Sequence, residues 1–276
     1  VKSEEGGKVK LAPDLQNAID QNELELLLQP QIDIVSGSPV GAEALLRWHH
    51  PVLGDIDARE VITVAEKTGL INKLSLWVFA TACAHLKLLR QKGFKHLTVS
   101  VNFSAHDLIL ESFVTSVLSI LDKNALKPDY FRLEFSEEIS IGSSVRFAQN
   151  LSELRELGFG LTLDDFGTGY ASLNYVGQLP FTEVKVDKSF ISRIHSNAHM
   201  NKMTKAMIAM TKSMGLKVIA EGVEHSETYR LLSEFGCDLV QGYLLTEALV
   251  IDELIDWLEF EQIDDIQSQT TYAIKR

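Results

Sequence analysis

Residues 160–170 read GLTLDDFGTGY, an apolar run that leads two adjacent aspartates directly into a glycine-rich turn. Neighbouring side chains on a β-strand point to opposite faces. Asp164 and Asp165 therefore cannot both be ordinary solvent-facing groups of one strand unless the strand ends there. We expect a strand over residues 160–165 that ends at the pair, so that both carboxylates can point toward a site at the carboxyl end of the strand.

Similar apolar runs recur along the chain and alternate with segments of helical periodicity, which is typical of β/α units around a parallel sheet. The other expected strands are residues 24–30, 40–48, 97–104, 131–138, 182–187, 217–224 and 239–245. Eight strands in about 250 residues predict a closed α/β barrel of the (β/α)8, TIM-like type. Residues 31–40, QIDIVSGSPV, are too short for a crossover helix, so we expect a hairpin and a first strand antiparallel to the rest.

The composition narrows the class of protein before any motif is considered. The chain has 276 residues and a formal net charge of −12, from 26 basic and 38 acidic side chains. This charge argues against binding of a nucleic acid polymer, which requires clusters of Lys and Arg. The two cysteines, Cys83 and Cys237, are far apart and lack metal-binding spacing, which suits buried thiols in a reducing compartment.

Both ends of the chain are polar, and no apolar run approaches the ~20 residues of a membrane span. We expect residues 1–10 to be a linker from an upstream region, residues 11–260 to form the barrel, and residues 261–276 to be a polar tail. The domain is therefore expected in the cytoplasm without membrane contact of its own. Whether a full-length protein is attached to a membrane stays open.

Residues 200–214 place all five methionines at spacings of three and four, which predicts one helix face that packs against the barrel or a partner subunit. His195 and His199 lie four residues apart just before this stripe, a spacing compatible with a zinc site. No glutamate lies between them, so a zinc site is the less favoured interpretation.

Polar residues interrupt the apolar strands at the level where each strand is expected to end. They are Glu43, Asn102, Glu134, Asp164, Asp165, Lys185 and Glu221. In a (β/α)8 barrel the carboxyl ends of the strands meet on one face, so these side chains are expected to gather there. One lysine cannot neutralise five buried carboxylates, but divalent cations can. Oxygen ligands favour hard ions, and the paired aspartates favour two ions about 3.5–4 Å apart, a clamp for in-line displacement at phosphorus.

Seven short motifs in a fixed order make the chain resemble a known family. They are EALLRW at 43–48, VNFS at 101–104, EFSE at 134–137, DDFGTGYASL at 164–173, KVD at 185–187, AEGVE at 220–224 and QGY at 241–243. This series resembles the EAL-domain phosphodiesterases of bacterial cyclic-di-GMP signalling, over roughly residues 15–255. The resemblance implies that the protein opens one phosphodiester of cyclic-di-GMP to give linear pGpG.

The resemblance also implies roles for individual residues. One metal ion would be held by Glu43, Asn102, Glu134 and Asp164, and the second by Asp164, Asp165 and Glu221. Lys185 would hold or deprotonate the attacking water, and Glu43 and Glu221 would complete the catalytic set. Substrate contacts are implied for Gln29, Arg47, Asp187, Glu224 and Gln241, and anchoring of the glycine-rich loop for Glu137, Gly167 and Gly169. The implied ions are Mg²⁺ or Mn²⁺, with Ca²⁺ as an ion that binds and inhibits.

The resemblance further implies a homodimer and an upstream sensory or GGDEF-type domain. The chain departs from the family at residues 245–248, LTEA, where members commonly have Phe-Ser-Lys-Pro, and at residues 59–66, REVITVAE, which lack a customary phenylalanine and proline. None of the expected metal ligands is replaced, so an active phosphodiesterase is the leading hypothesis. The alternatives are a receptor that binds cyclic-di-GMP without cleaving it, and another metal-dependent barrel enzyme of the aldolase or enolase type.

Overall fold

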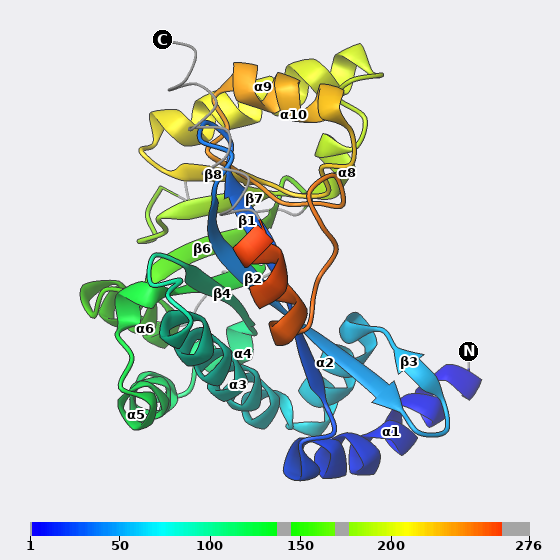
Figure 1. The fold of residues 1–276 in the computed structure, drawn as a ribbon. Helices are drawn as coiled ribbons and strands as arrows, with labels where there is room; N and C mark the ends of the chain where they lie inside the picture. Colours follow the sequence, from blue (N-terminus) through cyan, green and yellow to red (C-terminus); the bar gives the residue numbers. More distant parts are fainter. Residues whose placement is uncertain (1, 137–144, 169–176, 261–276) are drawn as a thin grey trace.

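Eight strands close into a barrel in the computed structural model, which describes residues 2–136, 145–168 and 177–260 (Figure 1). The barrel strands are β1 (Glu25–Asp33), β2 (Pro39–His50), β4 (Thr98–Phe103), β5 (Phe131–Ser136), β6 (Gly160–Phe166), β7 (Glu183–Val186), β8 (Lys217–Ala220) and β9 (Leu239–Val240). They follow one another around the barrel in chain order, and β9 pairs with β1 to close it. The prediction of a (β/α)8, TIM-like barrel is confirmed.

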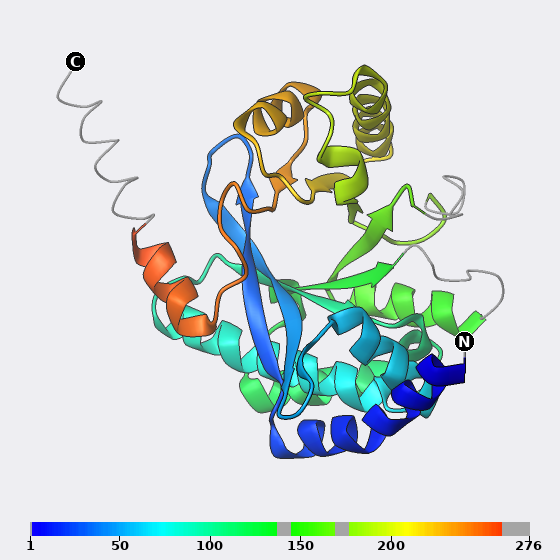
Figure 2. The same ribbon diagram turned by 90° about the vertical axis from the view of Figure 1, so that its right-hand side faces the viewer.

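The first strand runs opposite to the other seven. β1 is antiparallel to both of its neighbours, β2 and β9, and the remaining neighbouring pairs of the barrel are parallel. In the turn between β1 and β2, Asp33 Oδ1 accepts hydrogen bonds from the backbone N–H groups of Val35 and Ser36, and Gly37 adopts a φ of 73°. The predicted hairpin is confirmed, and it forms the long two-stranded ribbon in Figures 1 and 2.

Helices surround the barrel. They are α1 (Lys2–Gln21), α2 (Ala58–Thr68), α3 (Ile71–Gln91), α4 (Ala105–Leu108), α5 (Phe113–Asn124), α6 (Val145–Glu156), α8 (Lys188–Ile191), α9 (Ala198–Ser213), α10 (Ser226–Phe235) and a helix at residues 251–260, with a 3-10 turn η1 (Pro128–Tyr130) before β5. Helices α3, α5 and α6 lie on one side of the barrel, and α9 and α10 lie together away from them (Figure 1). Helix α1 includes most of the segment expected to be a linker, and its connection to an upstream region stays a prediction.

One short strand, β3 (Gly54–Ile56), is absent from the sequence-based prediction. It pairs with Trp48–His50 at the end of β2 and lies outside the barrel, near α1 and α2 (Figure 1). The chain then enters α2, where the Asp57 side chain caps the helix by accepting a hydrogen bond from Arg59 N over 2.8 Å. The end of β2 thus continues past its pairing with β1 and pairs with β3 outside the barrel.

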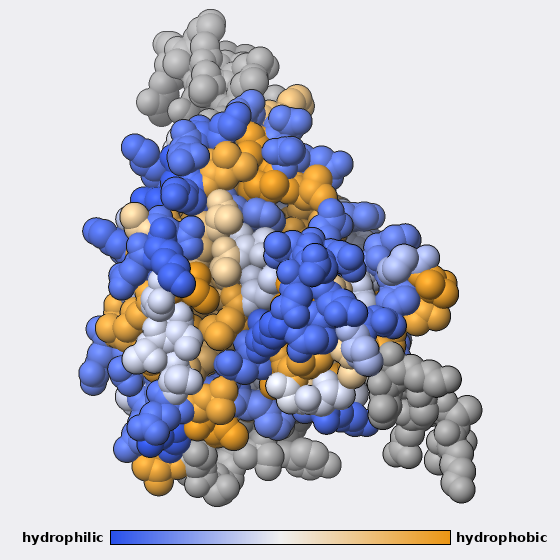
Figure 3. All heavy atoms as spheres, turned by 90° about the horizontal axis from the view of Figure 1, so that it is seen from below, coloured by the Kyte–Doolittle hydropathy of each residue, from blue (hydrophilic) through white to orange (hydrophobic). Residues whose placement is uncertain are grey.

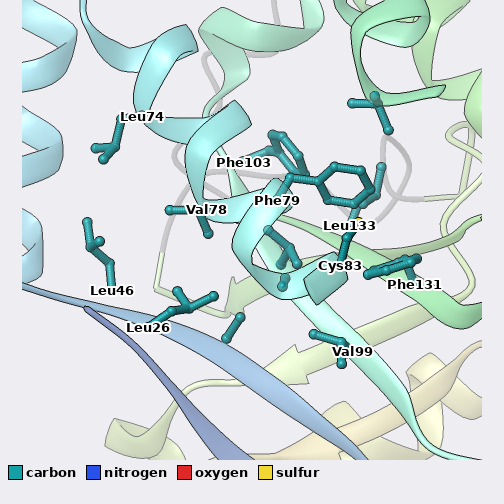
Figure 4. Close-up of a cluster of buried hydrophobic side chains, with 14 of the residues drawn as sticks. Leu26, Leu46, Leu74, Val78, Phe79, Cys83, Val99, Phe103, Phe131 and Leu133 are labelled. Atoms are coloured by element: carbon teal, nitrogen blue, oxygen red, sulfur yellow. The ribbon is translucent and has the colours of Figure 1, made fainter. Parts of the chain in front are cut away.

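The main hydrophobic core lies between the barrel and its helices, and α3 supplies much of it (Figure 4). The buried apolar residues of α3 are Leu74, Val78, Phe79, Ala82, Cys83, Leu86 and Leu89. Their spacing of three and four places them on one helix face. Phe79 packs against Phe103 of β4 and Phe131 of β5, with ring centroids 5.8 and 5.1 Å away. This packing fixes the strands that carry part of the polar site described below.

The methionine stripe and the cysteines take part in packing. Met207, Met210 and Met214 lie against the core, whereas Met203 is 38% exposed. Cys83 and Cys237 are free and buried, and burial raises the pKa of each thiol to about 12. The histidine pair does not share a helix face, because α9 begins at Ala198, after His195. His195 instead contacts Thr228 Oγ1 over 3.1 Å.

The outer surface is mixed in character. Viewed from below, the molecule is mostly hydrophilic with smaller apolar areas between the charged side chains (Figure 3). Scattered apolar residues of this kind are normal on protein surfaces. Within the described residues, no helix combines the length and the apolar composition that a membrane crossing requires.

Candidate metal centre

Five acidic side chains and one lysine meet toward the carboxyl ends of the barrel strands. We call this group the acid cluster, and its members are Glu43 of β2, Glu134 of β5, Asp164 and Asp165 of β6, Lys185 of β7 and Glu221, which follows β8. The register pairs Asn102 of β4 with Glu134 of β5, whereas Asp164 of β6 pairs with Ser136, two residues beyond Glu134, so the members are staggered from strand to strand. Their side chains nevertheless converge on Lys185. The gathering expected from the sequence is therefore present in the structure.

The Lys185 ammonium occupies the centre of the acid cluster. Its Nζ lies 2.6 Å from Glu134 Oε2, 2.7 Å from Glu221 Oε1, 3.1 Å from Glu43 Oε1 and 3.3 Å from Asp164 Oδ1. The side chain is completely buried. Burial alone would lower its pKa, but the carboxylates around it, Asp164 foremost, raise the pKa of Lys185 well above its usual value. Lys185 is therefore a constant cation and a hydrogen-bond donor.

One lysine leaves most of the negative charge of the acid cluster uncompensated. Burial is the largest influence on Glu134 and Glu221; with repulsion from nearby carboxylates, it raises the pKa of Glu134 well above the usual range and that of Glu221 to about 8. Burial and the same repulsion also raise the pKa of Asp164. Without further positive charge the acid cluster ionises only in part.

Glu43 is the one carboxylate of the acid cluster whose pKa is lowered. Burial opposes its ionisation, but Lys185 and hydrogen bonds from Gln241 and Asn102 outweigh that effect. Gln241 Nε2 donates to Glu43 Oε2 over 2.7 Å, and Asn102 Nδ2 donates to Glu43 Oε1 over 2.8 Å. Glu43 is therefore ionised and held at both oxygens, and Asn102 adjoins the acid cluster through it.

The carboxylates form two overlapping groups. Glu43, Glu134 and Asp164 form one, and Asp164, Asp165 and Glu221 form the other, with ligand oxygens in each group within 4.8 Å of one another. Oε1 of Glu134 is buried and accepts no hydrogen bond from the described residues. A buried carboxylate oxygen without a partner costs free energy unless a donor or cation compensates it. The all-oxygen donor set fits Mg²⁺, Mn²⁺ or Ca²⁺, so the acid cluster fits two hard cations that share Asp164.

The adjacent aspartates reach this site through a break inside the strand. β6 continues to Phe166, but its pairing with β7 shifts between Leu163 and Phe166. Asp165 adopts a φ of 57°, a left-handed conformation that is uncommon outside glycine. An irregularity of this kind re-aims a side chain, and here it brings Asp165 to the same site as Asp164. The expectation that the strand ends at the pair is therefore wrong, and a bulge has the same consequence.

Two of the expected substrate contacts adjoin the acid cluster. Gln241 donates to Glu43 as described, and its Nε2 also donates to Gln29 Oε1 over 2.9 Å. Arg47 lies four residues beyond Glu43 on β2 and is exposed, with its Nη1 donating to Leu46 O over 2.8 Å. The structure therefore brings the two amides to the site and leaves the guanidinium further along the strand.

The other two expected substrate contacts have different surroundings. Asp187 caps α8, and its Oδ1 accepts a hydrogen bond from Ser189 N over 2.9 Å. It also faces Asp165, whose pKa is raised by burial, by Asp164 and then by Asp187. Glu224 is exposed, and among the described residues no hydrogen bond or ion pair joins it to the acid cluster.

The backbone at the start of the glycine-rich loop requires glycine at position 167. Gly167 adopts a φ of 100°, as the expected freedom of this glycine implies. A Cβ at this position would lie 2.7 Å from Met207 Cε and 2.8 Å from Phe190 Cε2. Gly167 therefore packs directly against α8 and α9. The other expected loop residues, Glu137 and Gly169, lie outside the described residues.

Comparison with known proteins decides the family. The protein-family model described as the EAL domain matches residues 12–248. The chain belongs to the EAL-domain family. The resemblance drawn from the seven motifs is thereby confirmed.

Two curated relatives of this EAL domain come from Pseudomonas aeruginosa. The cyclic di-GMP phosphodiesterase PA2567 is 36% identical over 249 residues, which cover 90% of this chain and 42% of that protein. The cyclic di-GMP phosphodiesterase NbdA is 37% identical over 257 residues, which cover 93% of this chain and 33% of that protein. The chain thus spans less than half the length of these relatives.

Solved structures of EAL domains share the fold. The PaMucR phosphodiesterase in complex with c-di-GMP is similar with a TM-score of 0.83 and 34% identity, covering 89% of this chain and 99% of that chain. The EAL enzyme Bd1971 with cAMP and cyclic-di-GMP bound is similar with a TM-score of 0.87 and 26% identity, covering 91% of this chain and 69% of that chain.

Beneath the acid cluster, this EAL domain has a second charged layer that the sequence reasoning missed. Arg132 of β5 and Glu183 of β7 lie two residues before Glu134 and Lys185, and we call them the floor pair. Arg132 Nε donates to Glu183 Oε1 over 2.8 Å, and Arg132 Nη1 donates to Thr98 Oγ1. The period of two along a strand was the available signal, because it places these residues on the same face as the acids.

Gln31 is a second residue missed from the sequence. It is buried on β1, and its Nε2 donates to Gln241 Oε1 over 3.1 Å. It lies two residues after Gln29, so strand alternation again places both side chains on one face.

Proposed function

We propose that this EAL domain hydrolyses cyclic-di-GMP to linear 5′-pGpG with two divalent cations, Mg²⁺ or Mn²⁺. The observation that carries the proposal is the pair of overlapping carboxylate groups that share Asp164. The names of the relatives PA2567 and NbdA, and the c-di-GMP complex of a similar structure, support this choice of substrate. Ca²⁺ would occupy the same oxygen ligands and inhibit.

The division of work between cations and protein follows from the acid cluster. When bound, the two cations would lower the pKa of a coordinated water and stabilise negative charge on the phosphoryl oxygens. Glu43, which stays ionised, would anchor the first cation with Glu134, Asp164 and the neighbouring Asn102. Asp164, Asp165 and Glu221 would hold the second cation.

Lys185 has the properties of a donor. Its pKa is raised well above the usual value, so the ammonium keeps its proton at neutral pH. In this protonated form it can hold the attacking water by donating a hydrogen bond to the water oxygen. Of the two roles implied for Lys185, holding the water is therefore the one that we propose.

Substrate recognition would use residues on either side of the acid cluster. Arg47 is exposed, and its guanidinium can form paired hydrogen bonds to a phosphate. Gln29 and Gln241 would offer amide groups, and Asp187 and Glu224 remain proposed contacts. A homodimer, an upstream sensory or GGDEF-type domain and a cytoplasmic location are further proposals that rest on the family resemblance.

One observation favours a second function, a receptor that binds cyclic-di-GMP without turnover. Gln29 Nε2 donates to the backbone oxygen of Thr246 over 3.2 Å. Thr246 belongs to the LTEA segment, where the chain departs from the family. The acceptor is a main-chain oxygen, so the path of this segment, rather than a particular side chain, sets the position of Gln29. A changed path there can weaken positioning of the phosphodiester without removing the metal ligands.

The test is a product assay with the purified protein. Cyclic-di-GMP is incubated with Mg²⁺ or Mn²⁺, with and without a chelator, and the products are separated by anion-exchange chromatography. We expect pGpG to form only when a cation is present. Lys185→Met should stop its formation, whereas Lys217→Met, at an exposed position at the start of β8, should not.

The outcomes separate the two functions. Metal-dependent pGpG supports the phosphodiesterase. Tight binding of cyclic-di-GMP without any product in either metal would replace it with the receptor. Neither binding nor turnover, at concentrations where Mn²⁺ binding is measurable, would exclude both.

A further inference from the structure

Three glutamine side chains form a buried hydrogen-bond chain that ends on Glu43. Gln31 Nε2 donates to Gln241 Oε1 over 3.1 Å. Gln241 Nε2 in turn donates to Glu43 Oε2 over 2.7 Å and to Gln29 Oε1 over 2.9 Å. Gln31, Gln241 and Gln29 are 1%, 4% and 9% exposed. We call these three residues the glutamine chain.

The direction of the glutamine chain is set from both ends. Gln29 donates its own amide N–H to Thr246 O, which leaves its carbonyl for Gln241. Gln31 donates to the carbonyl of Gln241, which leaves the NH₂ of Gln241 for Glu43. The reverse orientation of Gln241 would set its carbonyl against a carboxylate, two acceptors with no proton between them. Gln31 therefore supports the one orientation of Gln241 that holds Glu43.

The strand register places Gln31 relative to the acid cluster. The β1–β2 register pairs Gln31 with Gly41 and Gln29 with Glu43, so Gln31 lies one layer below the acid cluster. A Cβ on residue 41 would lie 2.8 Å from Thr98 Oγ1 and 3.4 Å from Gln31 Oε1. The close approach is to Thr98, and the contact with Gln31 would be an ordinary van der Waals contact, so Gln31 and Gly41 are compatible neighbours at this level.

We propose that Gln31 is a positioning residue that acts through Gln241 to hold Glu43 in the orientation required by the first cation. This proposal rests on the proposed function, because it takes Glu43 to be a ligand of the first cation. Among the described residues, Gln31 makes no ion pair or hydrogen bond to a carboxylate of the acid cluster. Its influence on Glu43 must therefore pass through Gln241.

The experiment is a double-mutant cycle on Mn²⁺ affinity, measured by calorimetry on the full chain without substrate. The variants are Gln31→Met, Gln241→Met and the double variant, because methionine keeps the length of glutamine and removes its hydrogen bonds. Loss of a residue that orients a metal ligand typically weakens metal binding by about 10–100-fold, and we expect Gln31→Met to fall in that range. In the Gln241→Met background the effect of Gln31→Met should nearly vanish, since the connection is already broken.

A matched control and a second variant keep the result interpretable. Ser100→Ala removes another buried polar group of the barrel, a hydroxyl without a hydrogen-bond partner in the described chain, and should leave Mn²⁺ affinity unchanged. Should Gln31→Met fail to fold, Gln31→Glu retains the shape and sets a carboxylate oxygen against Gln241 Oε1, and should weaken Mn²⁺ binding as well.

The outcomes are distinct from those of the product assay. Unchanged Mn²⁺ affinity in Gln31→Met, or effects of the two single variants that multiply in the double variant, would overturn the positioning role. If the unaltered protein binds Mn²⁺ but forms no pGpG, the proposed phosphodiesterase activity is wrong. The double-mutant cycle then still tests the role of Gln31, because it measures Mn²⁺ affinity alone. Absence of Mn²⁺ binding in the unaltered protein would overturn both.

Discussion

The barrel interior carries two charged layers with opposite arrangements. In the floor pair, one guanidinium meets one carboxylate, and Thr98 and Thr162 add hydrogen bonds to them. In the acid cluster, four of the five carboxylates lie within 3.3 Å of the single ammonium of Lys185, and the fifth, Asp165, groups with Asp164 and Glu221. The two layers are only two residues apart on β5 and β7, yet only one of them is balanced.

This difference separates a structural role from a binding role. A buried pair with matched charges and completed hydrogen bonds needs no other partner, although breaking it is costly. A buried excess of carboxylates is stable only when protons or cations neutralise it. Burial and like charge raise the pKa of Glu221 and Asp164, which indicates that protons fill this role when cations are absent. Changes made in parallel in the two layers should therefore have different consequences.

The largest difference is expected for catalysis when one carboxylate in each layer becomes an amide. Glu43→Gln keeps the shape of the side chain but removes an anionic ligand of the first cation group. We expect pGpG formation to fall at least about 1,000-fold, the upper range for loss of one preorganised electrostatic group. Chromatographic measurement of pGpG at saturating Mn²⁺, with circular dichroism to confirm folding, is the measurement.

Glu183→Gln is the matched change in the floor pair. It lies in the same barrel interior and outside both carboxylate groups, so turnover by the folded fraction should stay within about tenfold of the unaltered protein. A Glu43→Gln variant that retains turnover at matched metal would remove Glu43 from the mechanism.

The next effect concerns stability and belongs to the floor pair. Arg132→Met leaves the Glu183 carboxylate buried without its cation, and removal of one partner of a buried pair typically costs about 3–5 kcal/mol. Denaturant unfolding should show this loss at any metal concentration. The double variant Arg132→Met, Glu183→Leu should recover much of it, because no unpaired charge remains. Equal stability of the single and double variants would show that the two side chains do not act as a pair.

Comparison of the two layers also shows which features of the fold and the site can be predicted from the sequence alone. The eight strands, the antiparallel first strand and the convergence of Glu43, Glu134 and Lys185 all follow from local periodicity and from the rule that strand ends share one face of a barrel. Each of these features depends either on residues close together in the sequence or on the geometry that every strand of a barrel shares. They can therefore be predicted from one amino-acid sequence.

What the sequence did not reveal depends on distant partners. Arg132 and Glu183 are 51 residues apart, and neither stands at the carboxyl end of its strand, so nothing local marks them as a pair. Gln31 acquires its meaning only when β9 brings Gln241 beside it. The positive φ of Asp165 is likewise a consequence of how β6 meets β7, since an isolated Asp–Asp sequence does not require a bulge.

A smaller effect is expected for the pH dependence of stability in the acid cluster. The pKa of Glu221 is raised by burial from its ordinary value of 4.5 to about 8 in the folded protein. Between these values the folded state binds more protons than the unfolded state, so stability must fall as pH rises. In chelator, raising the pH from about 6 to about 8 should reduce the free energy of unfolding by on the order of 1–3 kcal/mol.

Bound cations should oppose this fall in the free energy of unfolding as the pH rises. Metal ions compete with protons for the carboxylates, so the stabilisation by Mn²⁺ should grow over the same pH range. Glu221→Gln should flatten the dependence in chelator, because the group that loses its proton is gone. Thermal melts at several pH values, with and without Mn²⁺, measure both effects, and a chelated protein that gains stability with pH would contradict the assignment.

The smallest effect is expected for Glu134→Gln in the metal-free protein, and its sign is the informative part. Burial and like-charged neighbours raise the pKa of Glu134 well above the usual range, and its Oε1 has no hydrogen-bond partner among the described residues. A neutral amide removes that strain, while Lys185 keeps three other carboxylates within 3.3 Å. We expect a gain of about 1 kcal/mol in unfolding free energy in chelator, comparable to relief of one unsatisfied buried group, together with loss of stabilisation by Mn²⁺. The same substitution in the floor pair, Glu183→Gln, should destabilise. If both variants lose stability alike, Glu134 is an ordinary ion-pair partner of Lys185, and the acid cluster is a balanced structural network like the layer below it.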